Sequence, residues 1–135
     1  LALTAAAVLL RVAVGIGTRI LPYRCWRRLL RQATRTPACR GSAARGRLVG
    51  AAVGRTDHMM NPQGACLIRA LTGYILLRLV RGKGRIRLGI LTPTNSGELQ
   101  AHAWLECDGE VLIGEPMSGS GALRAREPQR RLQAV

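Results

Sequence analysis

The chain has 135 residues, enough for one domain with a modest core. Apolar residues make up 47% of it, which excludes a disordered chain. The net charge is +14, and 20 of the 21 basic residues are Arg, which partly reflects codon bias. Even so, we expect attraction to anionic partners such as nucleic acid, an acidic peptide or a membrane surface.

The most apolar stretch is residues 1–21, LALTAAAVLLRVAVGIGTRIL. A transmembrane helix needs ~20 apolar residues with few charges, and Arg11 and Arg19 interrupt this one. Basic residues that would precede the apolar run of a signal peptide are not visible. We therefore expect an amphipathic helix packed on the domain, with membrane-peripheral association or docking of a partner as the alternative.

A second helix is predicted over residues 23–33, because Pro22 suits a helix start. Its Arg-rich side is a solvated face or a docking surface for an acidic partner. A short helix is expected over 47–53, followed by a loop over 54–64. From Cys66 to Arg81 the pattern becomes helical, with apolar residues spaced by four at Leu67, Leu71, Ile75 and Leu79.

After Gly82 and Gly84 the period changes to two. Residues 85–91, RIRLGIL, predict a strand with Ile86, Leu88 and Ile90 on its buried face. Residues 100–107 predict a second strand, Asp108-Gly109 a hairpin turn, and 110 to 114 or 115 a third strand. This order predicts an α+β domain over residues 1–116, with a helical part over 1–57, a core over 58–116 and a mobile tail over 117–135.

The four cysteines are Cys25, Cys39, Cys66 and Cys107, without CxxC spacing or a regular framework. A chain of this size needs no disulfide scaffold, so we expect a reducing, cytoplasmic environment. The chain begins at Leu1 rather than Met, which leaves open whether its natural N-terminus is included.

Cys66 is a candidate nucleophile because it stands at the start of a predicted helix, after a Gly-containing turn. The partial positive charge of a helix N-terminus favours a thiolate, and its unpaired N–H groups can bind an oxyanion. A buried structural cysteine is an equal alternative at this position. His102 is a candidate base: only two histidines occur, and the other, His58, lies in a predicted loop. A lone histidine on a strand is nevertheless more often structural.

The register of the hairpin suggests an acidic partner for His102. With a two-residue turn, Cys107 pairs with Glu110, Leu105 with Leu112, Trp104 with Ile113 and His102 with Glu115. Directly opposed side chains lie ~5 Å apart, so Glu115 can fix the tautomer of His102. A surface carboxylate at a strand end is the alternative, and a bulge would shift this register by one.

Four segments form a recognisable pattern: CLIRAL at 66–71, Leu88 followed by Ile90, AHAWLE at 101–106 and DGEV at 108–111. This pattern resembles the stand-alone leader peptidases of lasso peptide biosynthesis, which are transglutaminase-like cysteine proteases. The resemblance covers about residues 60–116, with looser similarity in LPYRCW at 21–26. It implies a papain- or transglutaminase-like fold in which Cys66 attacks and His102 acts as base. The family acid is usually Asp; none follows Asp108, so Glu115 is the candidate.

The mechanism that follows is thioester hydrolysis: Cys66 attacks the scissile carbonyl, and His102 protonates the leaving amine and then activates water. The backbone N–H of Cys66 and an upstream side-chain amide, Gln63 before Asn61, are expected to hold the oxyanion. Trp104 is expected to wall the site or, equally, to be a core aromatic. The resemblance implies three partners: the precursor peptide, a leader-recognition protein and an ATP-dependent lasso cyclase. No cofactor is expected, and the chain has no GxxxxGK[ST] loop for ATP.

Three other hypotheses compete with this one. Charge favours a basic nucleic-acid-binding protein, although the chain has only four aromatic residues, Trp and Tyr, and no Phe. The same thioester could serve an acyltransferase, with an amine in place of water. A metal site built from His58, Cys66, His102 and Cys107 lacks the usual zinc spacings, so we expect no metal.

Overall fold

The computed structural model describes residues 1–36, 41–57, 66–91 and 100–114. Within these residues the elements are α1 Ala2–Ile20, α2 Tyr23–Arg35, α3 Ala43–Asp57, α4 Cys66–Leu79, β1 Arg85–Leu91, β2 Gln100–Cys107 and β3 Glu110–Ile113. The predicted α+β class is confirmed, with the helices first and an antiparallel sheet last. The predicted tail lies outside the described residues.

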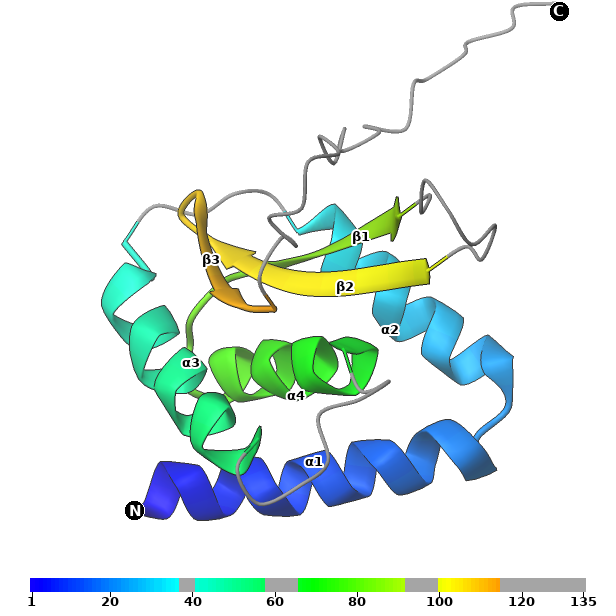
Figure 1. Ribbon diagram of the computed structural model, residues 1–135, viewed down its shortest axis with the longest axis horizontal. Coiled ribbons are helices and arrows are strands. Elements are labelled where there is room, and N and C mark those ends of the chain that lie inside the picture. Colours follow the sequence, from blue (N-terminus) through cyan, green and yellow to red (C-terminus); the bar gives the residue numbers. More distant parts are fainter. Residues whose placement is uncertain (37–40, 58–65, 92–99, 115–135) are drawn as a thin grey trace, which may run out of the picture.

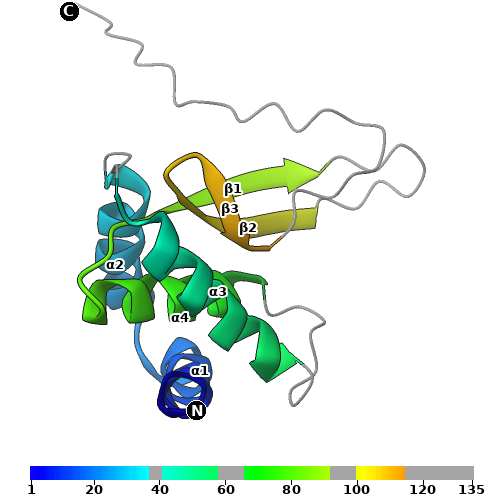
Figure 2. The ribbon, with the colours of Figure 1, turned by 90° about the vertical axis from the view of Figure 1, so that its left-hand side faces the viewer.

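The elements stack in three layers (Figure 1). The sheet, in the order β1-β2-β3, lies on one side of α4, and α1 crosses on the other side. Figure 2 shows the same order with α1 nearly end-on below α4. α3 packs along β3 and α2 along β1, so helices also cover the flanks of the sheet. β1 is an edge strand, and its predicted alternation is only partly right: Ile86 is buried, but Leu88 is 56% exposed.

α4 lies at the centre of the core, in contact with α1, α3 and all three strands. Leu71, Tyr74 and Leu77 are among its buried side chains. Most residues of α4 are apolar and its middle turns are buried, as expected of a helix in a protein interior. The predicted stripe ends too late, because Leu79 is 71% exposed and the helix stops there rather than at Arg81.

α3 is longer than the sequence predicted. The helix runs through Gly54, which was expected in a loop, and it begins at Ala43 rather than at residue 47. Its start is held by Asp108, whose Oδ2 accepts hydrogen bonds from the backbone N–H groups of Ser42 at 3.0 Å and Ala43 at 3.1 Å. A carboxylate there satisfies N–H groups that have no partner within the helix. Because Asp108 is distant in sequence, no local pattern reveals this cap.

The pairing of β2 with β3 corrects the predicted register. Cys107 pairs with Glu110 as predicted, but Leu105 pairs with Ile113 and not with Leu112. Leu112 is therefore the extra residue of a β-bulge, which bends a strand and shifts every later pair by one. The register that set residue 115 opposite His102 is wrong, and Glu115 itself lies outside the described residues.

The bulge has a packing explanation. Leu112 contacts α3, where a Cβ at Gly46 would lie 2.7 Å from its Cδ1, and Ile113 reaches Gly73 of α4. In a regular strand, consecutive side chains point to opposite faces, so only one of the two could face the core. The bulge turns both side chains inward, one against each helix.

α1 is strongly apolar yet buries few side chains. It packs on α3 and α4 with Ala7, Arg11 and Val14 buried. Apolar side chains on its outer side are exposed, among them Leu9 at 72% and Ile20 at 75%. By length and composition alone α1 could cross a membrane, a criterion that core helices and signal sequences also meet. The predicted packing on the domain is confirmed, and an apolar outer face is left exposed.

Candidate active site

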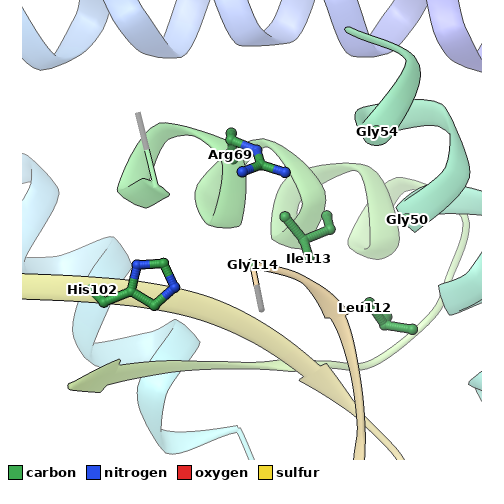
Figure 3. Close-up of a pocket in the computed structure, with 7 residues that line it drawn as sticks. All are labelled: Gly50, Gly54, Arg69, His102, Leu112, Ile113 and Gly114. Carbon is green, nitrogen blue, oxygen red and sulfur yellow. The ribbon is translucent and has the colours of Figure 1, made fainter. Parts of the chain in front are cut away.

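A pocket of about 510 Å³ opens where β3 ends, beside the first turns of α4 (Figure 3). Arg69 of α4 and His102 of β2 form its polar walls. The other lining residues are small or apolar and come from α3 and the end of β3: Gly50, Gly54, Leu112, Ile113 and Gly114. The arrangement therefore presents an imidazole and a guanidinium to a cavity with little other polar surface from side chains.

Glycines spaced by four residues form one face of α3. At Gly50 a Cβ would lie 2.8 Å from the backbone oxygen of Leu112, closer than a real Cβ atom can approach. The helix and β3 can therefore be this close only because Gly46 and Gly50 have no side chain. At Gly54, one turn further, no atom of the described residues lies within 4 Å of the Cβ position. The last glycine of this face thus borders the open pocket.

A shared pocket and two close contacts fix how α4 and β2 lie along one another. Arg69 and His102 line the same pocket, and a Cβ at Gly73 would lie 3.0 Å from Leu105 Cδ2. Further along, a Cβ at Gly84 would meet the Leu77 side chain and would lie 3.0 Å from the backbone oxygen of Glu106. Later residues of α4 therefore lie beside later residues of β2, and Figure 1 shows the two elements running in the same direction.

This alignment relates Cys66 to His102. Cys66 begins α4 about 10 Å before Gly73, at 1.5 Å per residue. His102 lies about 10 Å before Leu105, at 3.3 Å per residue. Since Gly73 and Leu105 are in contact, Cys66 and His102 belong to the same end of the α4–β2 layer. Both side chains are half-buried.

Trp104 and Glu106 continue the row of side chains from His102 along β2. The imidazole and indole rings stack with centroids 6.2 Å apart and an interplanar angle of 24°. The indole Nε1 donates to Glu106 Oε1 at 2.8 Å, and Arg87 Nε donates to Glu106 Oε2 at 3.1 Å. The predicted shared face of these three residues is confirmed. Trp104 is buried, which agrees with its prediction as a core aromatic, and it stacks on His102 without lining the pocket.

Glu106 is held in its charged form. Burial by itself raises the pKa of this carboxyl, but the hydrogen bonds from Trp104 and Arg87 outweigh it, aided by the charges of Arg87 and Arg85. The result is a pKa below the ordinary value. A charged acceptor strengthens the indole hydrogen bond, which fixes the ring against which His102 stacks.

An ion cluster joins three helices behind the pocket. Asp57, the last residue of α3, pairs with Arg11 of α1 at 2.6 Å and with Arg69 of α4 at 2.5 Å. Arg11 also donates to the Thr56 hydroxyl at 2.6 Å. Two guanidinium groups thus share one carboxylate, which leaves the cluster with an excess of positive charge. Arg11 Nη2 and Arg69 Nε are buried without a hydrogen-bond partner among the described residues.

Other predicted site residues are placed elsewhere or not described. Asn61, Gln63 and Glu115 lie outside the described residues, as does His58. Cys107 lies at the opposite end of the layer from Cys66, where its Sγ donates to the Lys83 backbone oxygen at 3.2 Å. Cys66 and Cys107 therefore cannot share the metal ion of the alternative hypothesis. In the part of the chain that the structure describes, no group of His, Cys, Asp or Glu is arranged to hold a metal.

Sequence reasoning missed Arg69, Gly50 and Gly54 as lining residues of the pocket. Two signals pointed to them. Arg69 lies about one turn after the candidate nucleophile Cys66, off the apolar stripe of the predicted helix. The glycines at 46, 50 and 54 recur at the helical spacing, which places them on one face of a helix. The second signal was lost because this segment was divided between a short helix and a loop.

The family model described as "Transglutaminase-like superfamily" matches residues 8–124. Among curated proteins and solved structures, no match was found. The matched range includes α1 from residue 8 onward, the other three helices and all three strands of the described chain.

Proposed function

Because the chain belongs to the transglutaminase-like superfamily, we propose that it is a cysteine peptidase that removes the leader from a lasso peptide precursor. Membership supports cysteine protease or acyltransferase-type chemistry. The CLIRAL and AHAWLE segments, which resemble the lasso leader peptidases, suggest the finer substrate. The proposal depends on one arrangement: Cys66 starts the helix that packs along β2 at the end where His102 lies.

In the proposed reaction the Cys66 thiolate adds to the scissile carbonyl carbon, and the tetrahedral intermediate collapses to a thioester. His102 gives a proton to the departing amine, which releases the peptide that follows the leader. His102 then takes a proton from water, whose oxygen attacks the thioester and releases the leader with a new carboxylate. The first step leaves Cys66 as a thioester, and hydrolysis in the second step regenerates its thiolate.

The remaining roles are also proposals. The N–H of Cys66, at the start of α4, is suited to hold the oxyanion, with Gln63 or Asn61 as the side-chain donor. Glu115 is the proposed triad acid on family grounds alone, because the observed register removes the geometric argument for it. Trp104 is a positioning residue: its ring, held by Glu106, stacks on His102 and limits how the imidazole can turn.

Cleavage of a lasso precursor peptide by the purified chain tests the proposal. Cys66→Ala and His102→Ala should each reduce the rate on the order of 10³-fold or more, because each removes a group that reacts. Cys25→Ala is the matched control, since it removes an exposed thiol from α2 and should cleave like the wild type. Wild-type cleavage by Cys66→Ala would sink the proposal.

Acyl transfer is the second candidate, because the superfamily match supports it equally. The same thioester would then react with an amine in place of water. Product masses separate the two: hydrolysis gives a leader with a carboxylate end, whereas transfer leaves the acyl group joined to the amine. An intact-mass measurement with and without an added primary amine decides between them.

The proposed partners are the precursor peptide, a leader-recognition protein and an ATP-dependent cyclase. The exposed apolar side of α1 supports docking of the recognition protein, since such faces commonly mark interaction sites. Ile16→Glu should weaken that association while cleavage of a short peptide stays unchanged. Vesicle sedimentation of the same variant tests the alternative, a peripheral membrane contact through residues 1–21.

A further inference from the structure

We propose that the pocket beside His102 binds an acidic side chain of the peptide substrate, and that Arg69 selects it. The inference rests on the proposed function and adds to it the class of residue that the substrate carries near the scissile bond. It depends on the charge of the pocket and on its empty floor at Gly54.

The charge argument begins with the ion cluster. Asp57 neutralises only one of the two guanidinium groups that contact it, Arg11 and Arg69. The Arg11 side chain is 4% exposed and also donates a hydrogen bond to Thr56. The Arg69 side chain is 25% exposed and lines the pocket. The positive charge left over is therefore presented to the pocket by Arg69. None of the described lining residues is acidic.

Arg69 is also held ready to bind. A guanidinium has five N–H donors in a planar fork, and the bond to Asp57 Oδ2 is made through Nη2. That bond fixes the plane of the group. Nε is buried, so the donors that remain for a ligand are the other N–H groups at the end of the guanidinium. A hydrogen bond to a charged acceptor is about twice as strong as one to a neutral acceptor, so a carboxylate should be preferred to an amide.

The shape argument comes from α3. The space beside Gly50 is filled by Leu112. Beside Gly54, the described residues leave space for a ligand group. Figure 3 shows Gly54 and Arg69 on the α3–α4 side of the pocket and His102 on the β2 side. A peptide whose scissile bond lies at Cys66 and His102 can thus extend a neighbouring side chain past His102 toward Arg69.

A second cationic pocket offers a control. It is lined by Arg35 and Arg78 with Lys83, and all three side chains are exposed to solvent. Arg78 is on α4, like Arg69, but at the opposite end of the helix. Removal of Arg78 lowers the net charge as much as removal of Arg69 does, without changing the pocket beside His102.

The test uses the full chain and short peptides. The probes are N-acetylated tetrapeptides with a fluorogenic amide leaving group, with Glu or Gln placed at each of the four positions in turn. For one position, kcat/KM of the wild type should be at least about tenfold higher with Glu than with Gln, the effect of one charged hydrogen bond. Arg69→Met should abolish this ratio, and Arg78→Met should keep it.

A second pair of variants covers the case in which Arg69→Met folds poorly, as a thermal melt would show. Gly54→Leu fills the pocket and should lower kcat/KM for the Glu peptide about tenfold or more. Gly15→Leu is its control. Gly15 is also in a helix and has no described atom within 4 Å of its Cβ position, but it lies on α1. Equal losses in both variants would contradict the pocket assignment.

The outcomes separate the two proposals. Cleavage that depends on Cys66 but shows no Glu preference, or a preference that persists in Arg69→Met, overturns the selection by Arg69 and leaves the peptidase proposal standing. Absence of any Cys66-dependent cleavage, of these peptides and of precursor, overturns the proposed function and this inference with it.

Discussion

The two ends of the layer formed by α4 and β2 differ in how completely they are filled. At the far end, Leu77 and Leu105 are buried, Gly84 lies against both, and Cys107 bonds the Lys83 backbone oxygen. At the near end, Cys66 and His102 are half-buried, and His102 lines an open pocket. The same two elements thus carry dense packing at one end and candidate chemistry at the other.

The difference shows how a small domain can keep an open site. Packing at the far end and the middle fixes the position of β2 along α4, so the near end needs no further contacts to stay aligned. Interiors are close-packed and deform little, which lets an alignment set at Gly73 and Leu105 hold for residues about 10 Å away.

Cysteine variants at the two ends should break function and stability separately. Cys66→Ala should lose activity on the order of 10³-fold with little change in unfolding free energy. Cys107→Ala should keep activity but lose about 1–2 kcal/mol of stability, because it leaves a small cavity and an unpaired carbonyl. Peptidase assays and urea unfolding measure the two effects. A folded but inactive Cys107→Ala protein would contradict this division.

Glycine variants should sharpen the contrast between filled and open regions. At Gly73 a new Cβ would collide with the Ile113 side chain and touch Leu105 Cδ2 at 3.0 Å. Gly73→Ala should therefore cost about 1–3 kcal/mol of unfolding free energy through overpacking. Gly54→Ala meets no atom of the described residues, and should stabilise α3 by up to about 1 kcal/mol through helix propensity. Equal unfolding midpoints for the two variants would show that the packing around Gly73 is loose.

The cap at Asp108 tests the far end with a smaller effect. Asp108→Ala leaves the N–H groups of Ser42 and Ala43 without their acceptor and should cost about 1 kcal/mol. Asp108→Asn is the control, since Asn also tolerates the left-handed φ of 54° at this position and keeps one acceptor oxygen. Activity at a temperature where both remain folded should match the wild type. A larger stability loss in the Asn variant than in the Ala variant would refute the capping role.

Local patterns predicted much of this fold. The change of period after Gly82 located β1, the Asp108-Gly109 dipeptide located the hairpin, and the start of α4 fell at Cys66 as expected. Each depends on residues close together in sequence, where backbone preferences and side-chain alternation act. The position of Cys66 at a helix start, on which the catalytic hypothesis rests, was available from the sequence in this way.

Features that depend on distant contacts could not be predicted. The bulge at Leu112 arises because α3 and α4 each accept one of two consecutive side chains. The full length of α3 depends on Asp108, and the open face at Gly54 depends on where β3 ends. A single sequence does not reveal which helix will meet which strand, so the hairpin was predicted as regular and Glu115 was assigned by a register that does not occur.

The smallest expected effect is a pH dependence of stability that arises from Glu106. This residue lies toward the far end of the layer, in the same row of side chains on β2 as Trp104 and His102. A carboxyl whose pKa is lowered in the folded state stabilises the fold above its ordinary pKa of about 4.3. That contribution is lost as the pH falls through the lower folded-state value. The Tm difference between wild type and Glu106→Gln should thus be largest at neutral pH and disappear in acid. Glu110→Gln removes an exposed partner of Arg47 and should show little difference at any pH. If Glu106→Gln also lowers kcat at neutral pH without changing KM, Glu106 acts on His102 through Trp104, and the two ends are coupled by that row.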